Sequence, residues 1–321
     1  MERAPFFDDL AEGPDNGAAY WLRADDGVRL RIGVWPQADA RGTAIIFPGR
    51  TEYAEKYGRA AADLAARGYA TLAIDWRGQG LADRLLPDRA IGHVEDFADY
   101  QRDVAAVIAA AHALDLPRPW HLIAHSLGGC IGLRAVMSGL PVQSCVFSAP
   151  MWGITLAPAT RPAAWALGWS AARLKLGRSM APGTSPVHLV LGEPFEGNPL
   201  TTDRDMFDYM RSHLVMQPDL SLGGPSIHWV HKALVEMRAL ARLPSPSLPC
   251  LTFLGTAEKI VDPGRIDARM AAWPGGSLQM VAGAEHEVLM ETPAIRALAF
   301  DQATALFDAS ADGPVNRARI G

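Results

Sequence analysis

The 321-residue sequence lacks the marks of several protein classes. No apolar run approaches the roughly 20 residues that a membrane-spanning helix needs. Residues 1–9 are acidic, whereas a secretory signal would be basic and then apolar. The formal net charge is -5 and no Lys/Arg cluster is present, which argues against a nucleic-acid-binding protein. These absences predict a cytoplasmic protein that binds no nucleic acid.

Cysteine is also scarce. The three cysteines, Cys130, Cys145 and Cys250, each stand inside an apolar segment, and no CxxC spacing occurs. Disulfide frameworks and cysteine metal sites need more thiols at closer spacing. We therefore expect three buried free thiols, and we expect neither a metal site nor a cofactor.

What the sequence does contain is typical of a folded globular protein, with 49% hydrophobic and 20% charged residues. Residues 18–23 and 28–35 predict two antiparallel strands, because an Asp-Gly turn joins them. Apolar strand-like runs and helical patterns then alternate. The expected strands are 43–47, 70–74, 120–125, 144–148, 250–254 and 277–281, and the expected helices are about 54–66, 94–113, 130–137, 263–272 and 293–307. This alternation predicts an α/β fold with a mostly parallel sheet that helices cover on both faces.

The alternation stops between residues 151 and 243, where aromatic and Pro-rich segments replace buried strands. We expect a mainly helical cap insertion there, between body segments 1–150 and 244–321. Within it, Trp165, Trp169, Ala172 and Leu176 recur at helical spacing. This apolar face either packs on the body, lines an acyl pocket or touches a membrane surface.

The run 120–129 predicts a nucleophile elbow, in which a strand enters a helix through a turn that exposes a serine. Ser126 is that serine, and Ala124 and Gly128 are the small residues that flank it. The usual pattern has glycine at both flanking positions, so Ala124 departs from it by one methyl group.

A serine nucleophile needs a base and a carboxylate that orients the base. His286 is the predicted base, because it follows a strand in a small-residue loop near the C-terminus. Glu258, in the loop after strand 250–254, is the preferred acid. Asp262 is the alternative acid, and it could instead cap the next helix. His125 adjoins Ser126, but neighbours in an elbow point in different directions, so we assign it no catalytic role.

Acyl transfer also needs backbone donors for the oxyanion. The N–H of Leu127, which follows the nucleophile, is one predicted donor. The loop after strand 43–47 usually provides the second, and there the N–H of Arg50 follows a proline and a glycine.

Taken together, these stretches resemble the α/β-hydrolase superfamily, and within it the monoglyceride lipases and bacterial lysophospholipases. The matching stretches are residues 47–53, 75–80, 124–129, 149–153, 223–229 and 284–287. The resemblance implies an α/β-hydrolase fold, a triad of Ser126, His286 and an acid, an oxyanion hole at Arg50 and Leu127, and a lid over an acyl-binding cleft. In the matching insertion stretches, Trp152, His228 and Trp229 are the candidate substrate-binding residues.

The first functional hypothesis is a serine hydrolase that cleaves the carboxylic ester of a single-chain lipid, such as a lysophospholipid or a monoacylglycerol, through an acyl-enzyme. Carboxylesterase, thioesterase, peptidase and acyltransferase activities stay open, because a fold does not fix a substrate. The second hypothesis is a non-catalytic ligand-binding protein on the same fold. The resemblance and the apolar face also suggest peripheral attachment to the inner membrane, and no obligate protein partner is evident.

Overall fold

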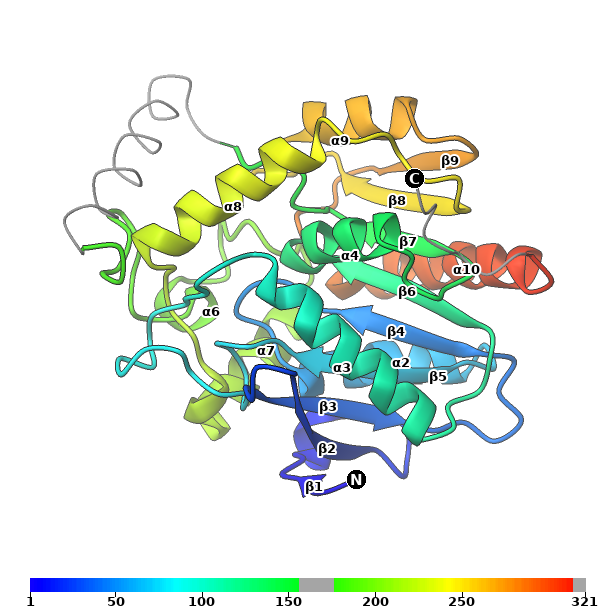
Figure 1. The fold of residues 1–321 in the computed structure, drawn as a ribbon, viewed down its shortest axis with the longest axis horizontal. Helices are drawn as coiled ribbons and strands as arrows, with labels where there is room; N and C mark the ends of the chain where they lie inside the picture. The colour runs from blue at the N-terminus through cyan, green and yellow to red at the C-terminus, as the bar shows by residue number, and fades with distance from the viewer. Residues whose placement is uncertain (156–175, 314–321) are drawn as a thin grey trace.

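The computed structural model describes residues 1–155 and 176–313. Within these ranges, one sheet of nine strands has the order β1-β2-β3-β5-β4-β6-β7-β8-β9 (Figure 1). The strands are β1 (Arg3–Ala4), β2 (Ala18–Arg23), β3 (Arg29–Trp35), β4 (Thr43–Phe47), β5 (Ala70–Asp75), β6 (Trp120–His125), β7 (Cys145–Ser148), β8 (Cys250–Gly255) and β9 (Gly276–Val281). From β5 through β9 every neighbouring pair is parallel, and β1, β2 and β3 add an antiparallel edge. The predicted hairpin and the mostly parallel sheet are confirmed.

Helices cover both faces of this sheet. The helices are α1 (Asp8–Ala11), α2 (Gly58–Ala65), α3 (Asp99–Ala113), α4 (Leu127–Met137), α6 (Leu189–Gly192), α7 (Arg204–Met216), α8 (Ile227–Leu240), α9 (Pro263–Ala271) and α10 (Pro293–Ser310), with short 3-10 turns η1 (Ala54–Tyr57), η2 (Pro218–Leu220) and η3 (Val288–Met290). In Figure 1, α3 and α4 cross in front of the sheet, and α2 and α10 lie behind it. The layers are those of an α/β-hydrolase fold.

Strand β4 shows why the buried runs are apolar throughout. Ile45 and Phe47 point into the core cluster on the α3 and α4 side, and Ala44 and Ile46 point into the cluster on the α2 and α10 side. All four are fully buried. A strand covered on both faces cannot alternate apolar and polar residues, and each large aliphatic side chain buried here contributes about 1.5–3 kcal/mol.

Two predicted helices begin later than the sequence pattern indicated. The 54–66 segment opens as the 3-10 turn η1 and becomes the helix α2 only at Gly58, where an added Cβ would lie 1.9 Å from the carbonyl oxygen of Ala11. The 94–113 segment becomes the helix α3 only at Asp99. Asp96 accepts the N–H of Ala98 and Asp99 accepts the N–H of Asp96, and these local side-chain bonds favour a turn over helix. Strand β1 and helix α1 were not predicted at all.

Residues 151–155 and 176–243, here called the covering segment, lie mostly beyond the carboxyl ends of the parallel strands, at the left of Figure 1. Their described helices are α6, α7 and α8. Of the predicted apolar face, Trp165, Trp169 and Ala172 lie outside the described residues, and Leu176 is exposed. No helix in the described ranges is both long and apolar enough to cross a bilayer. Cys130, Cys145 and Cys250 are buried free thiols, as predicted.

Candidate active site

Ser126 lies in a tight turn between β6 and α4. Its backbone has φ 48° and ψ -115°, a region that non-glycine residues rarely adopt. Its N–H donates to the Ser148 carbonyl at 3.1 Å, and its own carbonyl accepts the N–H of Met151 at 2.8 Å. A Cβ at Gly128 would lie 1.9 Å from the carbonyl oxygen of Phe47, so only glycine fits there. This is the strand, turn and helix geometry expected of a nucleophile elbow.

Ala124 stands where a nucleophile elbow usually has glycine, and a glycine in α4 leaves space for its methyl group. A Cβ built at Gly132 would lie 3.2 Å from the methyl group of Ala124, a tight contact. The glycine on the helix therefore leaves room for the methyl group on the strand. Ala124 is fully buried in this contact.

His286 and Glu258 form a buried hydrogen-bonded pair. Glu258 Oε2 lies 2.7 Å from His286 Nδ1, and the side chains are 1% and 5% exposed. The other carboxylate oxygen, Oε1, accepts the N–H groups of Ile260 at 2.5 Å and Val261 at 3.0 Å. Burial disfavours the charged form of Glu258, but the bond and charge of His286 and the two backbone bonds together lower the pKa of Glu258. Glu258 is thus an ionised carboxylate that orients the imidazole through Nδ1. The other ring nitrogen, Nε2, takes no part in this bond.

Asp262, the alternative acid, stands at the N-cap position of α9, before Pro263. Its N–H donates to the carbonyl of Gly153 at 3.0 Å, and its carbonyl accepts the N–H of Arg265 at 3.1 Å. Nδ1 of His286 is hydrogen-bonded to Glu258. The structure therefore brings Glu258 to the imidazole.

The two predicted oxyanion donors border the serine from different elements. Leu127 is the first residue of α4, so its N–H has no acceptor within the helix. Arg50 lies in the loop after β4 and lines the same cavity as Ser126. Gln79 Nε2 holds this loop by donating to the carbonyls of Gly49 at 2.8 Å and Glu52 at 3.2 Å.

Sequence reasoning missed Glu52, which fixes the backbone of this loop. Its Oε2 accepts the N–H of Gly49 and, at 2.6 Å, the hydroxyl of Tyr57, while Oε1 lies 2.7 Å from Lys56 Nζ. Burial works to raise the pKa of Glu52, but the charge of Lys56 and the hydrogen bonds from Lys56 and Tyr57 help to lower it to about 2. An acid three residues after the loop glycine, with a lysine four residues further along a helical turn, was the available signal.

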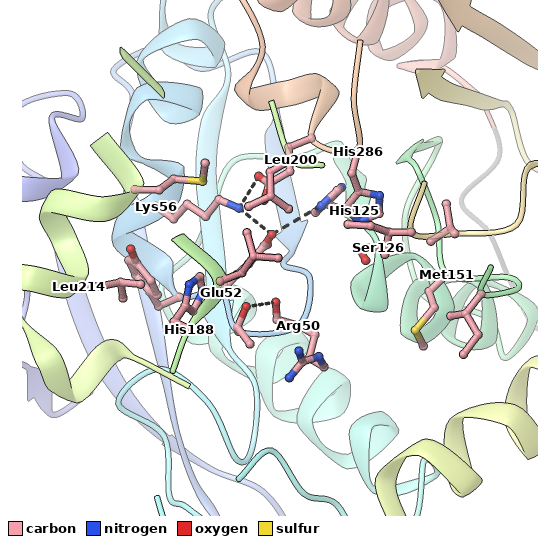
Figure 2. Close-up of a pocket in the computed structure, with 18 of the residues that line it drawn as sticks. Arg50, Glu52, Lys56, His125, Ser126, Met151, His188, Leu200, Leu214 and His286 are labelled. Atoms are coloured by element: carbon pink, nitrogen blue, oxygen red, sulfur yellow. Dashed lines mark hydrogen bonds and ion pairs between the residues drawn. The ribbon is translucent and has the colours of Figure 1, made fainter. Parts of the chain in front are cut away.

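Lys56 joins Glu52 to Glu287, the residue after His286, through hydrogen bonds to both carboxylates. Glu52, His125 and Glu287 are also close enough together to hold a metal ion. However, the ammonium group of Lys56 already lies between the two carboxylates and provides the cation there (Figure 2). We therefore interpret these side chains as an internal ion-pair network and not as a metal centre.

His125, to which we assigned no catalytic role, lies close to the candidate base. The ring centres of His125 and His286 are 4.7 Å apart. Its Nδ1 lies 3.0 Å from the Ser148 carbonyl oxygen, and its Nε2 lies 3.6 Å from Glu52. Burial lowers the pKa of His125 to about 3, so the imidazole is neutral at physiological pH. Its contacts are those of a packing residue behind Ser126.

A cavity of about 220 Å³ opens at Ser126 and His286. Figure 2 shows both residues at one end, with Arg50, Glu52 and Lys56 on another part of the wall. The covering segment provides mostly apolar lining: Met151, Ile154, His188, Leu189, Leu200, Met210, Leu214 and Trp229. The cavity therefore combines a few reactive groups from the body with an apolar wall from the covering segment.

Of the three candidate substrate-binding residues, Trp229 lines this cavity, and its Nε1 donates to the hydroxyl of Tyr100 at 3.1 Å. Trp152 and His228 are not part of the lining. The indole of Trp152 is buried against Trp273 and donates to the carbonyl of Gly129 at 3.1 Å. His228 Nε2 bonds the carbonyl of Glu95 at 2.8 Å.

Comparisons with known proteins agree with this geometry. The family described as serine aminopeptidase, S33, matches residues 38–293. Lysophospholipase L2 of Escherichia coli strain K12 is 33% identical over 267 residues, which cover 79% of this chain and 77% of that protein. A probable lysophospholipase L2 of Haemophilus influenzae is 29% identical over 269 residues, with 82% of each chain covered.

Among solved structures, a soluble variant of monoglyceride lipase from Saccharomyces cerevisiae matches with a TM-score of 0.70 and 20% identity, covering 90% of this chain and 94% of that one. This structure supports the fold, and the family match extends over most of the sequence. The chain belongs to the serine aminopeptidase S33 family of α/β-hydrolases, and lysophospholipase L2 is among its relatives.

Proposed function

We propose that this protein is a serine hydrolase that cleaves the carboxylic ester of a single-chain lipid, a lysophospholipid or a monoacylglycerol, through an acyl-enzyme. The observation that carries the proposal is the 2.7 Å bond between Glu258 and His286, because His286 lines the same cavity as Ser126 on its strained turn. A weak nucleophile becomes reactive when an oriented base takes its proton, and these three residues have the chemistry for that task.

In the first half of the proposed reaction, His286 Nε2 takes the hydroxyl proton of Ser126 as Oγ attacks the ester carbonyl carbon. The N–H groups of Leu127 and Arg50 stabilise the oxyanion of the tetrahedral intermediate. When the intermediate collapses, the carbon–oxygen bond to the glycerol breaks, and His286 gives its proton to the departing alcohol. Glu258 stabilises the imidazolium that exists between these two transfers.

In the second half, water takes the place of the alcohol. His286 removes a proton from this water, whose oxygen attacks the acyl carbonyl, and then returns the proton to Ser126 as the fatty acid leaves. Both halves use the same oxyanion donors. The products are a free fatty acid and a glycerol or glycerophosphodiester.

The apolar wall supports a substrate with an acyl chain. Six lining residues from the covering segment carry aliphatic or thioether side chains: Met151, Ile154, Leu189, Leu200, Met210 and Leu214. Such a surface binds hydrocarbon through the hydrophobic effect. The Escherichia coli and Haemophilus influenzae relatives are named as lysophospholipases, which agrees with this substrate class.

We also propose that residues 151–243 act as a cap over this site and touch a lipid surface, so that the protein associates peripherally with membranes. Supporting this, Val215 and Met216 at the end of α7 are 61% and 63% exposed, and Leu176 is 53% exposed. Sedimentation with vesicles that contain phosphatidylglycerol would test it. We expect the protein in the pellet, and its complete retention in the supernatant would contradict membrane association.

The test of the function is the hydrolysis of four purified substrates. Oleate release is measured for 1-oleoyl lysophosphatidylcholine, 1-oleoylglycerol and dioleoyl phosphatidylcholine, and p-nitroaniline release is measured for an aminoacyl p-nitroanilide. We expect turnover of the two single-chain esters and at least about 10³-fold less by Ser126→Ala, since residual catalysis without a nucleophile is small. Cleavage of only the anilide would identify a peptidase. An unreactive wild-type protein that binds oleoyl lipids would identify a binding protein.

A further inference from the structure

Arg50 is one of the residues that line the cavity, and neutral groups hold its side chain. Its Nη1 donates to the carbonyl of Gly223 at 2.8 Å, and its Cζ lies 5.9 Å from the centre of the Trp229 ring. Both partners belong to the covering segment, whereas Arg50 belongs to the body. The bond to Gly223 uses one of the five N–H donors of the guanidinium.

No carboxylate pairs with this cation in the part of the chain that the structure describes. The remaining stretches, 156–175 and 314–321, contain no Asp or Glu in their sequence. Burial without a counter-charge lowers the pKa of Arg50 to about 10, so the guanidinium is still charged at neutral pH. Arg50 is half-buried, and a partly desolvated cation without an acid is stabilised by a ligand that provides the missing charge.

The other basic residues of the wall differ from Arg50. Lys56 is bonded to the carboxylates of Glu52 and Glu287. Burial lowers the pKa of His188 to about 4, so its imidazole is neutral at physiological pH. In Figure 2 the guanidinium of Arg50 lies apart from the bonded group around Lys56. Arg50 is therefore the cation of the described lining that is available to an anion.

The separation between the backbone N–H and the guanidinium of Arg50 resembles the separation between the ester and the phosphate of a lysophospholipid. The backbone N–H of Arg50 is a proposed oxyanion donor, and three methylene groups separate the backbone from the guanidinium. In a lysophospholipid, the glycerol backbone separates the ester from the phosphate. An ester carbonyl at the N–H thus brings a phosphate within reach of the same residue's side chain, and guanidinium groups bind phosphate oxygens through paired hydrogen bonds.

We propose that the Arg50 side chain binds the phosphodiester of a lysophospholipid headgroup and makes the enzyme prefer lysophospholipids to neutral monoacylglycerols. This inference rests on the proposed function and deepens it. Arg50 then has two separate roles, since the backbone acts on every ester and the side chain acts only on esters that carry a phosphate.

The test is the ratio of kcat/KM for 1-oleoyl lysophosphatidylcholine to kcat/KM for 1-oleoylglycerol, both in the same neutral detergent micelles. We expect the ratio to fall about 10- to 100-fold in Arg50→Gln, because a hydrogen-bonded charge pair is lost, and to fall less in Arg50→Lys, which keeps the charge. Arg178→Gln is the matched control. It removes an equal charge from the covering segment outside the cavity lining, so its ratio stays within about twofold of wild type.

An unchanged ratio in Arg50→Gln, or an equal loss on both lipids, would overturn the proposal. Fluorophosphonate labelling of Ser126 in the same preparations separates this from failure of the proposed function. If wild type is labelled but hydrolyses neither lipid, the function fails and the inference fails with it. If inorganic phosphate inhibits both lipids in wild type but neither in Arg50→Gln, the site binds a free anion, and the headgroup assignment is overturned.

Discussion

The body and the covering segment contribute different things to the same cavity. Ser126, Glu258 and His286 all lie in loops that follow strands of the body sheet, and ladder hydrogen bonds hold those strands. The covering segment contributes mostly apolar side chains. It meets the body beside the candidate base, where the N–H groups of His286 and Glu287 donate to the carbonyls of Pro199 and Leu200 at 3.2 Å and 2.8 Å.

This difference between the regions indicates that the rate of ester hydrolysis and the preference among esters can be changed separately. A change at Ser126, Glu258 or His286 should slow the hydrolysis of every ester by a similar factor, whereas the side chain of Arg50 should act only on esters that carry a phosphate. A change in the apolar wall should alter which ester is preferred. The predictions that follow test this separation, starting with the largest effect.

The largest effect is expected from the acid on the body. Glu258→Gln removes the charge that stabilises the imidazolium, so we expect kcat to fall about 10³- to 10⁴-fold on both p-nitrophenyl butyrate and 1-oleoylglycerol. Asp262→Asn, at the N-cap of α9, is the matched control and should lower kcat less than about fivefold. A larger loss in Asp262→Asn than in Glu258→Gln would reverse the acid assignment.

A smaller effect, still common to all esters, is expected from Glu52. Glu52→Gln keeps the size of the side chain but cannot neutralise Lys56, so the loop that carries Arg50 should shift. We expect kcat to fall about 30-fold with little change in KM, since a small displacement of a catalytic donor is costly. Circular dichroism checks that the variant is folded. If only the long-chain ester is affected, Glu52 belongs to the wall and not to the reaction machinery.

The wall itself should control acyl length. Met210 on α7 is buried and lines the cavity. Met210→Phe fills part of that space, so kcat/KM for p-nitrophenyl palmitate should fall about tenfold relative to the butyrate ester. Met210→Leu, which nearly conserves volume, is the control. An unchanged chain-length profile in Met210→Phe would contradict the separation of rate and selectivity.

The smallest effect concerns pH and compares one buried histidine from each region. Burial lowers the pKa of His121, in β6, and of His213, in α7, to about 4. Between about pH 6.5 and 4 the unfolded chain binds these protons and the folded chain does not. The free energy of unfolding is therefore highest above pH 6.5 and falls as the pH decreases through this window.

His121→Gln and His213→Gln should each reduce that pH-dependent loss by about 1–2 kcal/mol, measured by urea unfolding at pH 7.5 and pH 5. The same experiment sharpens the comparison of the regions. A loss that only His213→Gln reduces would place acid sensitivity in the covering segment alone. An identical loss in wild type and both variants would contradict the burial effect.

The sequence predicted the elements that depend on local signals. A tight turn flanked by small residues indicates Ser126, and the loops after apolar strands indicate Glu258 and His286, because each signal lies within a few neighbouring residues. The predicted hairpin and parallel strands appear in the structure for the same reason. The late start of α3 depends on side-chain bonds of Asp96 and Asp99 that a periodicity pattern does not contain.

Non-local features could not be predicted in the same way. Lys56 meets Glu287 across 231 residues of chain, and Arg50 meets Gly223 across 173. The first pairing joins two distant parts of the body, and the second follows from the packing of the covering segment on the body. No short stretch of sequence encodes either. The resemblance that suggested Trp152 and His228 gave residues of the right region, but only Trp229 of the three lines the cavity.

Fluorophosphonate labelling tests the central claim, the activation of Ser126 by His286 and Glu258, without requiring the natural substrate. The measurement is the labelling rate of wild type, Glu258→Gln and Asp262→Asn, with mass spectrometry of the modified peptide. We predict stoichiometric labelling of Ser126 in wild type, a rate reduced about 10³-fold in Glu258→Gln, and a rate near wild type in Asp262→Asn. If Ser126 in wild type stays unlabelled even when detergent loosens the covering segment, the site is not an assembled nucleophile and the account is wrong.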